Sequence, residues 1–338
     1  MMGKAPRSSR LPPLRQHGVA LLLALIILAL VATLTATMVW QQNRAVQVEA
    51  AERARVQAAW ILSGALDWAR LILREDQRNN QQRARPYDSL DEVWATPLAE
   101  ARLSSFLAAD RDNNADSGPE AFISGGITDA QARYNVRGLV NNDGKINAVQ
   151  VQAFQQLCDL AGAPTDLASR LAQAMESVWS LKSQDGGART AADANPPLRP
   201  ARLADLVWLG ADASTLARLE PWVDLLPFPT PVNVNTAPRE ALLAAIDKLD
   251  MGSADRLIQS RQRKPFESLA DVKAMLGPDT ELDEARVSVA SSYFWVAGRL
   301  RLEDRVLEER SLLVRRDGRV DVLQRERRSF VQAPRLTP

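Results

Sequence analysis

Two side chains on which much enzyme chemistry depends are nearly missing from this sequence. Among its 338 residues there is one histidine, His17, and one cysteine, Cys158. The body therefore lacks the partners for a Ser-His-Asp or Cys-His catalytic set and for the usual zinc site, and no disulfide can form within the chain. Cys158 lies in the run AFQQLC (153–158), where a small buried thiol on a helix is favoured over a reactive one. No pair of carboxylates stands out at catalytic spacing, so we predict that the protein is not an enzyme.

An excess of charge of either sign is also missing from the chain as a whole. Lysine and arginine number 42 against 41 acidic residues, so no general basic field predicts binding to nucleic acid. The first 18 residues are the exception, because they contain basic side chains and no acidic ones. These are Lys4, Arg7, Arg10 and Arg15. A basic start before a nearly neutral body is typical of a targeting segment.

A long uncharged segment follows this basic start. Residues Val19 to Val39 are almost wholly apolar, and about 20 helical residues are enough to cross the hydrocarbon core of a bilayer. Neither glycine nor proline occurs between Val19 and Ser63, and apolar positions keep helical spacing after the charges begin. We therefore predict one membrane-spanning helix, apolar first and amphipathic later. The alternative, a signal peptide cut near Thr35 or Thr37, predicts turn-forming residues that are not found there.

The charges around this helix predict its orientation and its length. Basic residues before the span hold the N-terminus in the cytoplasm, which places the body in the periplasm of a Gram-negative bacterium as a single-pass inner-membrane protein. The polar run from Gln77 to Pro86 predicts that the helix ends near Arg74.

Alternating apolar positions predict strands in two groups. The expected strands are Glu120–Gly125, Ile127–Val136, Tyr293–Leu302, Val306–Arg316 and Val320–Arg328. Asp317-Gly318 is a strong hairpin signal between the last two. Because a few strands alone are marginally stable, the amphipathic part of the long helix is expected to pack on them.

A helical stretch separates the two groups of strands. Thr236 with Pro238, and Ser268 with Asp271, are typical of helix starts, and Ser183–Pro200 reads as a loop. The expected helices are Ala148–Ala161, Asp166–Ser180, Ser214–Leu219, Arg239–Leu249, Ser253–Arg263 and Ser268–Leu276. We predict an α+β protein in which a large all-α domain is inserted into a sheet domain.

The junction of Gly18 and Val19, between a basic leader and an apolar helix, resembles the processing site of pilins and pseudopilins. In that family prepilin peptidase cuts after the glycine, so the resemblance implies that Gly18 and Val19 are the scissile pair and that Val19 is N-methylated. Most such subunits have glutamate at the fifth mature position, where this sequence has Leu23. A subunit without that acid fits a position with no subunit above it, at the tip of a fibre.

A second motif narrows the resemblance. The segment Pro231–Pro238, PVNVNTAP, with the region up to Ser268 looks like the helix-hairpin-helix-related unit of the type II secretion system minor pseudopilin K family. The resemblance covers most of residues 12–316. It implies a pilin-like fold, with a long N-terminal transmembrane helix packed on an antiparallel sheet and an inserted all-α domain that contains the helix-hairpin-helix-like unit. The expected divisions are a leader (1–18), a transmembrane and stalk helix (19–76), the first part of the sheet domain (77–146), the inserted helical domain (147–280) and the C-terminal strands (281–338).

The same resemblance implies a role and a set of partners. Members form a tip complex that initiates and caps the periplasmic pseudopilus for export of folded proteins across the outer membrane. The implied partners are minor pseudopilins I and J, the major pseudopilin, prepilin peptidase and the inner-membrane assembly platform, and no nucleic acid is expected.

One acidic segment has the ligand chemistry of a calcium site. Its hard oxygen donors at close spacing are Asp110, Asp112, Asn114, Asp116 and Glu120. Family members with bound calcium are known, so calcium is a candidate ligand here, although no cofactor is required. The run Asn141–Ile146 matches only the middle of an EF-hand, because Leu139 and Gln150 stand at the first and twelfth ligand positions.

Two other functions fit parts of the pattern. A membrane-anchored competence protein would bind DNA through the hairpin, yet the turn Leu249–Ser253 has only one glycine and an acid beside it. The basic residues nearby, Arg256, Arg261, Arg263 and Lys264, are also typical of a solvated face. A type IV minor pilin would share the processing and the stalk but would normally keep the fifth-position glutamate.

Overall fold

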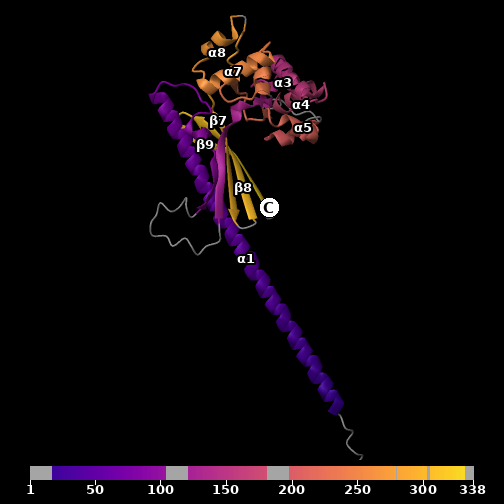
Figure 1. Ribbon diagram of the computed structural model, residues 1–338. Coiled ribbons are helices and arrows are strands. Elements are labelled where there is room, and N and C mark those ends of the chain that lie inside the picture. Colours follow the sequence, from indigo (N-terminus) through magenta and orange to yellow (C-terminus); the bar gives the residue numbers. More distant parts are fainter. Residues whose placement is uncertain (1–16, 104–120, 181–197, 279, 303–304, 332–338) are drawn as a thin grey trace, which may run out of the picture. The chain divides into compact units, whose positions relative to one another are not determined.

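The computed structural model describes residues 17–103, 121–180, 198–278, 280–302 and 305–331 (Figure 1). Its first element, α1 (His17–Gln82), is a continuous helix of 66 residues. The prediction that this helix ends near Arg74 is wrong. Glutamine and arginine are good helix formers, so the polar run prolongs the helix. The chain leaves the helix where Ala84 adopts a left-handed conformation and Pro86 follows.

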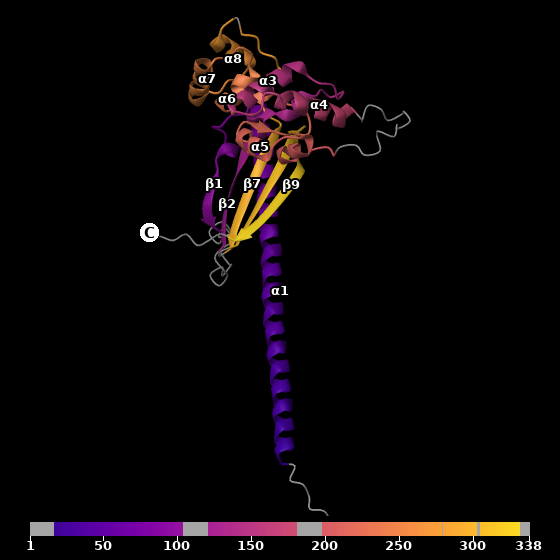
Figure 2. The same ribbon diagram turned by 90° about the vertical axis from the view of Figure 1, so that its right-hand side faces the viewer.

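Five antiparallel strands form the main sheet, in the order β1-β2-β7-β8-β9 (Figure 2). They are β1 (Leu98–Arg102), β2 (Ala121–Asp129), β7 (Tyr293–Leu302), β8 (Arg305–Arg316) and β9 (Arg319–Val331). The three C-terminal strands confirm the prediction, and Asp317 and Gly318 both have positive φ in the β8–β9 turn. β2 runs through the break expected at Gly126, whereas β1 was not predicted. β2 pairs directly with β7, so the helices that separate these two strands in the sequence are inserted between two strands that are neighbours in the sheet.

The last part of α1, from Leu62 onward, packs on this sheet through an apolar core. Leu66 and Leu73 meet Phe294 and Leu313, and the Trp94 ring lies edge-on to Phe294 with centroids 5.2 Å apart. Gly298 in β7 allows close approach, since a Cβ there would lie 3.1 Å from the Leu62 side chain. The predicted α+β arrangement, a long helix on an antiparallel sheet, is therefore confirmed.

The remaining helices surround two further apolar cores. The helices are α3 (Ala148–Leu160), α4 (Leu167–Ser180), α5 (Ala213–Leu219), α6 (Arg239–Ala245), α7 (Met251–Arg263) and α8 (Leu269–Leu276). The 3-10 turns are Val93–Ala95, Ala130–Ala132, Val136–Leu139 and Leu203–Leu209. Two parallel pairs join β3 (Tyr134–Asn135) to β4 (Val223–Asp224) and β5 (Val232–Asn233) to β6 (Val287–Ser288). Cys158 is buried in the first core, where burial raises the pKa of its thiol to about 12.

The two predicted helix starts have different outcomes. Ser268 caps α8 and forms a reciprocal capping box with Asp271, as predicted. Thr236 does not cap α6, which begins at Arg239 after Pro238, because the Thr236 hydroxyl donates instead to Asp129. Most of the predicted loop Ser183–Pro200 lies outside the described residues.

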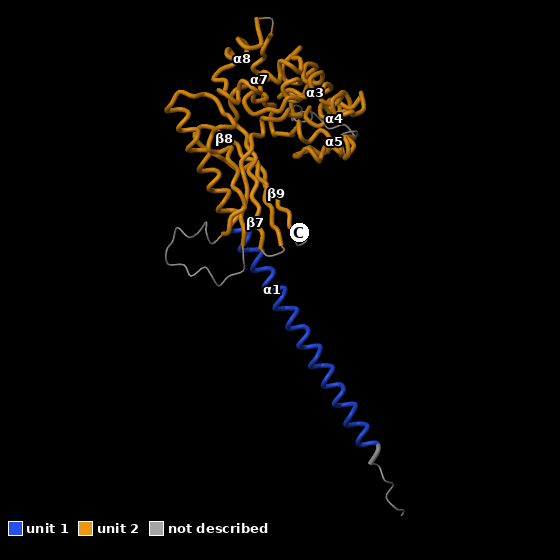
Figure 3. Tube along the Cα trace, in the orientation of Figure 1, with its two compact units in different colours: residues 1–60 blue, residues 61–338 orange. Residues whose placement is uncertain are grey.

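Contacts divide the chain into two compact units, residues 1–60 and residues 61–338 (Figure 3). The second unit contains the five-stranded sheet together with helices α3 to α8. The predicted limits of an inserted domain at residues 147 and 280 stay a prediction.

Candidate functional site

The N-terminal part of α1 is the first candidate for a functional role. The helix is long and apolar enough to cross a membrane, with a mean hydropathy of 2.9 in its most apolar window. Its polar groups are satisfied locally, because the hydroxyls of Thr33, Thr35 and Thr37 donate to backbone carbonyls one turn earlier. An outward-facing apolar surface with satisfied hydroxyls suits a lipid or helical environment.

The predicted cleavage pair lies at the very start of this helix. Gly18 was expected just outside the helix, but α1 begins at His17 and Gly18 belongs to its first turn. The described helix therefore starts two residues before Val19, a difference within the fraying of a helix end. Val19 and Leu23 are exposed, at 66% and 56%. The structure therefore keeps an apolar side chain at the position where most pilin-like subunits have an acid.

The candidate calcium ligands cannot be placed. Asp110, Asp112, Asn114, Asp116 and Glu120 all lie outside the described residues, in the segment between β1 and β2.

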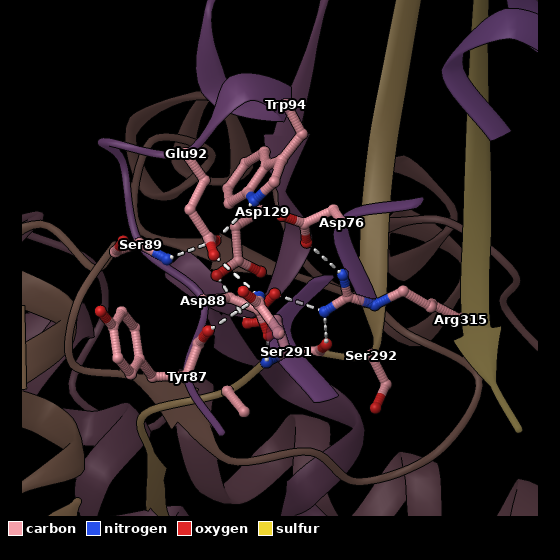
Figure 4. Close-up of polar contacts among 12 residues, drawn as sticks. Asp76, Tyr87, Asp88, Ser89, Glu92, Trp94, Asp129, Ser291, Ser292 and Arg315 are labelled. Atoms are coloured by element: carbon pink, nitrogen blue, oxygen red, sulfur yellow. Dashed lines mark hydrogen bonds and ion pairs between the residues drawn. The ribbon is translucent and has the colours of Figure 1, made fainter. Parts of the chain in front are cut away.

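A buried ionic cluster joins the end of α1 to the sheet (Figure 4). Arg315 of β8 is buried, and its Nη1 donates to Asp76 at 2.8 Å while its Nη2 donates to Asp88 and to the carbonyl of Ser291. The guanidinium also lies 4.7 Å from the centre of the Phe294 ring. One cation thus ties together α1, the loop after it and two strands.

Three carboxylates of this cluster have the spacing of a metal site. Ligand oxygens of Asp76, Asp88 and Glu92 lie within 4.8 Å of one another. However, Arg315 already pairs with Asp76 and Asp88. Glu92 accepts hydrogen bonds from Asn80, Trp94 and the Ser89 amide. Burial and the neighbouring Glu92 outweigh Arg315 and raise the pKa of Asp76 to about 6. The arginine supplies the positive charge that a metal would otherwise bring, so this is a structural joint.

The second polar cluster is centred on the PVNVNTAP segment. Asn233 is fully buried, and its amide donates to Asp129, to the Ser291 hydroxyl and to the Asp88 carbonyl at 2.9–3.1 Å. Asp129 also accepts from Thr236 and from Ser291, both at 2.6 Å. Burial raises the pKa of Asp129 to about 6 although these donors lower it. The motif therefore locks β5 against the end of β2 and the start of β7.

Asn235 performs a similar task for the helices that follow. Its amide donates to the Phe266 carbonyl and its oxygen accepts from the Phe266 amide, both at 2.9 Å. This pair fixes the connection between α7 and α8. The two asparagines of the motif thus have internal structural partners.

The basic residues near the hairpin are mostly engaged within the chain. Arg261 donates to the Val234 carbonyl at 2.6 Å, and burial lowers its pKa to about 10. Arg256 donates to Ser253, and Lys264 pairs with Glu267. A DNA-binding hairpin would need these basic side chains to contact phosphates, but most of them already have partners within the chain.

Sequence reasoning missed Asp76, Asp88 and Arg315. Arg315 lies 239 residues from Asp76 and 227 from Asp88, so no local pattern links them. Arg315 stands next to Arg316 at the end of the apolar run Leu312–Val314, so the local sequence does not distinguish it from an exposed basic end of a strand.

Comparison with known proteins assigns the chain. Family models described as "Type II secretion system (T2SS), protein K" match residues 132–228 and 232–290. The chain belongs to this protein K family. Its members are minor pseudopilins, which are structural subunits rather than enzymes.

Curated relatives match almost the full length. The type II secretion system protein K of Pseudomonas aeruginosa is 28% identical over 326 residues, covering 92% of each chain. That of Pectobacterium carotovorum is 29% identical over 336 residues, covering 92% of this chain and 96% of its own. Both family models and both relatives belong to protein K rather than to a competence protein or a type IV pilin.

A solved structure supports the fold. The chain is similar to one in the crystal structure of the GspK-GspI-GspJ complex from the enterotoxigenic Escherichia coli Type 2 Secretion System, with a TM-score of 0.55 and 21% identity. The likeness covers 82% of this chain and 98% of that one. At this identity the likeness concerns the fold.

Proposed function

We propose that this minor pseudopilin joins minor pseudopilins I and J in a tip complex that initiates and caps the periplasmic pseudopilus. The observation that carries the proposal is the protein K family match combined with an unbroken α1 that has Leu23 at the fifth position from Val19. A subunit without an acid there cannot neutralise the free N-terminus of a neighbour above it. The complex named for the similar solved structure supports the choice of partners.

Processing and location follow from the same segment. Prepilin peptidase cuts between Gly18 and Val19 and methylates Val19, which leaves the apolar helix in the mature protein. The basic leader keeps the N-terminus in the cytoplasm, so the body faces the periplasm of a Gram-negative cell. In the inner membrane the helix contacts the assembly platform before the subunit meets the major pseudopilin.

Two finer features belong to the proposal. Helices α6 to α8 form a helix-hairpin-helix-like unit that serves packing or docking rather than DNA binding, in keeping with the internal contacts of Arg261. The acidic segment from Asp110 to Glu120 binds calcium through its carboxylate and amide oxygens.

The first experiment tests processing. We would measure the mass and N-terminal sequence of the mature protein from membranes with and without active prepilin peptidase, for wild type, Gly18→Val and the leader control Gly3→Val. We expect a start at Val19 only with active peptidase, lost in Gly18→Val and kept in Gly3→Val. A start near Gln41 would mean a soluble secreted protein and would overturn the tip role.

The second experiment tests the position in the fibre. Gold-labelled antibody against the body should mark only the ends of isolated pseudopili, and the chain should co-purify with I and J. Labelling along the shaft would contradict capping, even if processing at Val19 were correct.

A further inference from the structure

A large pocket lies in the second unit between the end of α4, the 3-10 turn Leu203–Leu209 and strand β9. Its volume is about 1060 Å³. Its lining includes the group Arg137, Trp179 and Arg199, called here the first wall, and the apolar side chains of Leu226, Phe228 and Leu323. The ionic cluster around Arg315 does not contribute to it, so the pocket is separate from the structural joint.

The first wall contains two cations on one aromatic ring. The guanidinium carbon of Arg137 lies 4.8 Å from the centre of the Trp179 ring, and that of Arg199 lies 4.9 Å from it. Arg137 is only 3% exposed, whereas Arg199 is exposed to solvent. Burial, together with the nearby charge of Arg199, lowers the pKa of Arg137 to about 10. The two like charges therefore repel each other in a partly dry site.

The other arginines of the pocket have carboxylate partners. Arg202 pairs with Asp205 at 3.1 Å and with Glu326 at 3.6 Å. Arg325 pairs with Glu309 at 3.2 Å. Their charges are compensated within the chain.

Arg137 and Arg199 lack such compensation within the described part of the chain. Arg137 donates only to the carbonyls of Val140 and Asn141, and its buried Nε has no hydrogen-bond partner there. No described carboxylate pairs with either guanidinium. A buried cation that is hydrogen-bonded to neutral groups and faces a second cation is costly, and a bound anion would remove the repulsion.

The rest of the pocket indicates which anion fits. The volume is far larger than one small anion needs, and Phe228 and Leu323 offer exposed apolar surface, at 58% and 45%. β9 is an edge strand, with one side unpaired within the sheet, and Leu323 lies at its bulge.

We propose that this pocket binds an acidic peptide segment of a partner protein. A carboxylate of the peptide pairs with Arg137 and Arg199 beside Trp179, and a neighbouring apolar side chain packs on Phe228 and Leu323. Charge complementarity with two uncompensated arginines selects the acid, and the exposed apolar side chains select the peptide over a free anion. This binding site goes beyond the tip role and does not depend on it.

The test uses the full chain in detergent micelles and a short fluorescein-labelled peptide in which aspartate and glutamate alternate with phenylalanine and leucine. Fluorescence anisotropy should show saturable binding, and the matched peptide with asparagine and glutamine should not bind. Arg199→Gln should weaken binding about ten-fold or more, because one charge-assisted contact is lost. Arg263→Gln, on α7 outside the pocket, is the matched control and should bind like wild type.

A charge reversal gives an independent readout. Arg199→Glu supplies Arg137 with the missing carboxylate, so it should raise the Tm of the protein and abolish peptide binding. A lower Tm for Arg199→Glu, or equal peptide affinity for wild type and Arg199→Gln, would overturn the proposal.

Three further outcomes would show that Arg137 and Arg199 bind a different partner, and each would overturn the peptide proposal. The first is binding of inorganic phosphate as tight as that of the peptide. The second is tight binding of single-stranded DNA that Arg199→Gln removes. The third concerns acids of the chain's own sequence at Asp185 and Asp193. If replacing both by asparagine lowers the Tm in wild type but not in Arg199→Gln, these acids are the partners of the arginines.

Discussion

Arg315 on β8 donates from Nη1 to Asp76 on α1 at 2.8 Å, across 239 residues of sequence. Arg315 is buried, the Asp76 side chain is 11% exposed, and the pair lies near the C-terminal end of α1 (Figure 4). Because the same guanidinium also holds Asp88, it fixes both the end of α1 and the loop that follows. In a pseudopilin whose helix anchors the body to a fibre, this joint determines how firmly the end of α1 is held.

Removing this cation should destabilise the body strongly. Arg315→Ala leaves Asp76 and Asp88 buried without a counter-charge, and we expect the free energy of unfolding to fall by about 3–5 kcal/mol. Arg315→Lys keeps the charge but cannot reach both carboxylates, so its loss should be smaller. Urea unfolding followed by circular dichroism measures the change. The exposed Arg319→Ala is the control, and an equal loss there would contradict the role of the buried pair.

Stability should depend on pH through Asp76. Since its pKa is raised from 3.8 to about 6, the folded state binds this proton more tightly than the unfolded state. The stability that the folded protein gains from this bound proton is fully present below about pH 4 and is lost as the pH rises through 6. Asp76→Asn removes this dependence, so the stability of the variant relative to wild type should increase between pH 4 and 7. A relative stability independent of pH would refute this, and Asp67→Asn, an exposed acid of α1, should keep the wild-type profile.

Substitution of Asn233 should lower the stability of the protein. Asn233→Ala removes one hydrogen bond each from Asp129, the Ser291 hydroxyl and the Asp88 carbonyl, and we expect the free energy of unfolding to fall by about 1–3 kcal/mol. Asn233→Asp is the sharper variant, because it sets a carboxylate against Asp129 and should be less stable at pH 7 than at pH 5. Unfolding curves at both pH values test this. Similar curves for Asn233→Asp at the two values would show that the two acids do not interact.

Two adjacent glycines in β2 should respond differently to alanine. A Cβ at Gly125 would overlap the backbone carbonyl oxygen of Ala297, whereas a Cβ at Gly126 meets nothing closer than Pro97 at 3.6 Å. We expect Gly125→Ala to lower the free energy of unfolding by about 1–3 kcal/mol or more, and Gly126→Ala to change it much less. Thermal unfolding of the two variants compares them directly. Equal losses would mean that strand entropy, not the clash, dominates.

Local patterns predicted the parts of the fold that depend on neighbours in sequence. The apolar run after Val19 has the length of a membrane span, alternation marks β7 to β9, and Asp317-Gly318 has the conformational freedom that its tight turn requires. The serine cap at Ser268 was likewise readable from the sequence. The end of α1 was not, because polar residues there stay helical and only Ala84 and Pro86 end it.

The candidate sites divide in the same way. Gly18, Val19 and Leu23 are positions along one helix, so the sequence alone determined the anchor and the cleavage proposal. Tertiary structure alone decided that Arg315 meets Asp76 and Asp88, that Asn233 meets Asp129, and that Arg137 and Arg199 share the ring of Trp179. The physical reason is that a buried charge requires a partner but does not specify where in the chain that partner stands. Only the packing of distant segments brings the partner within reach.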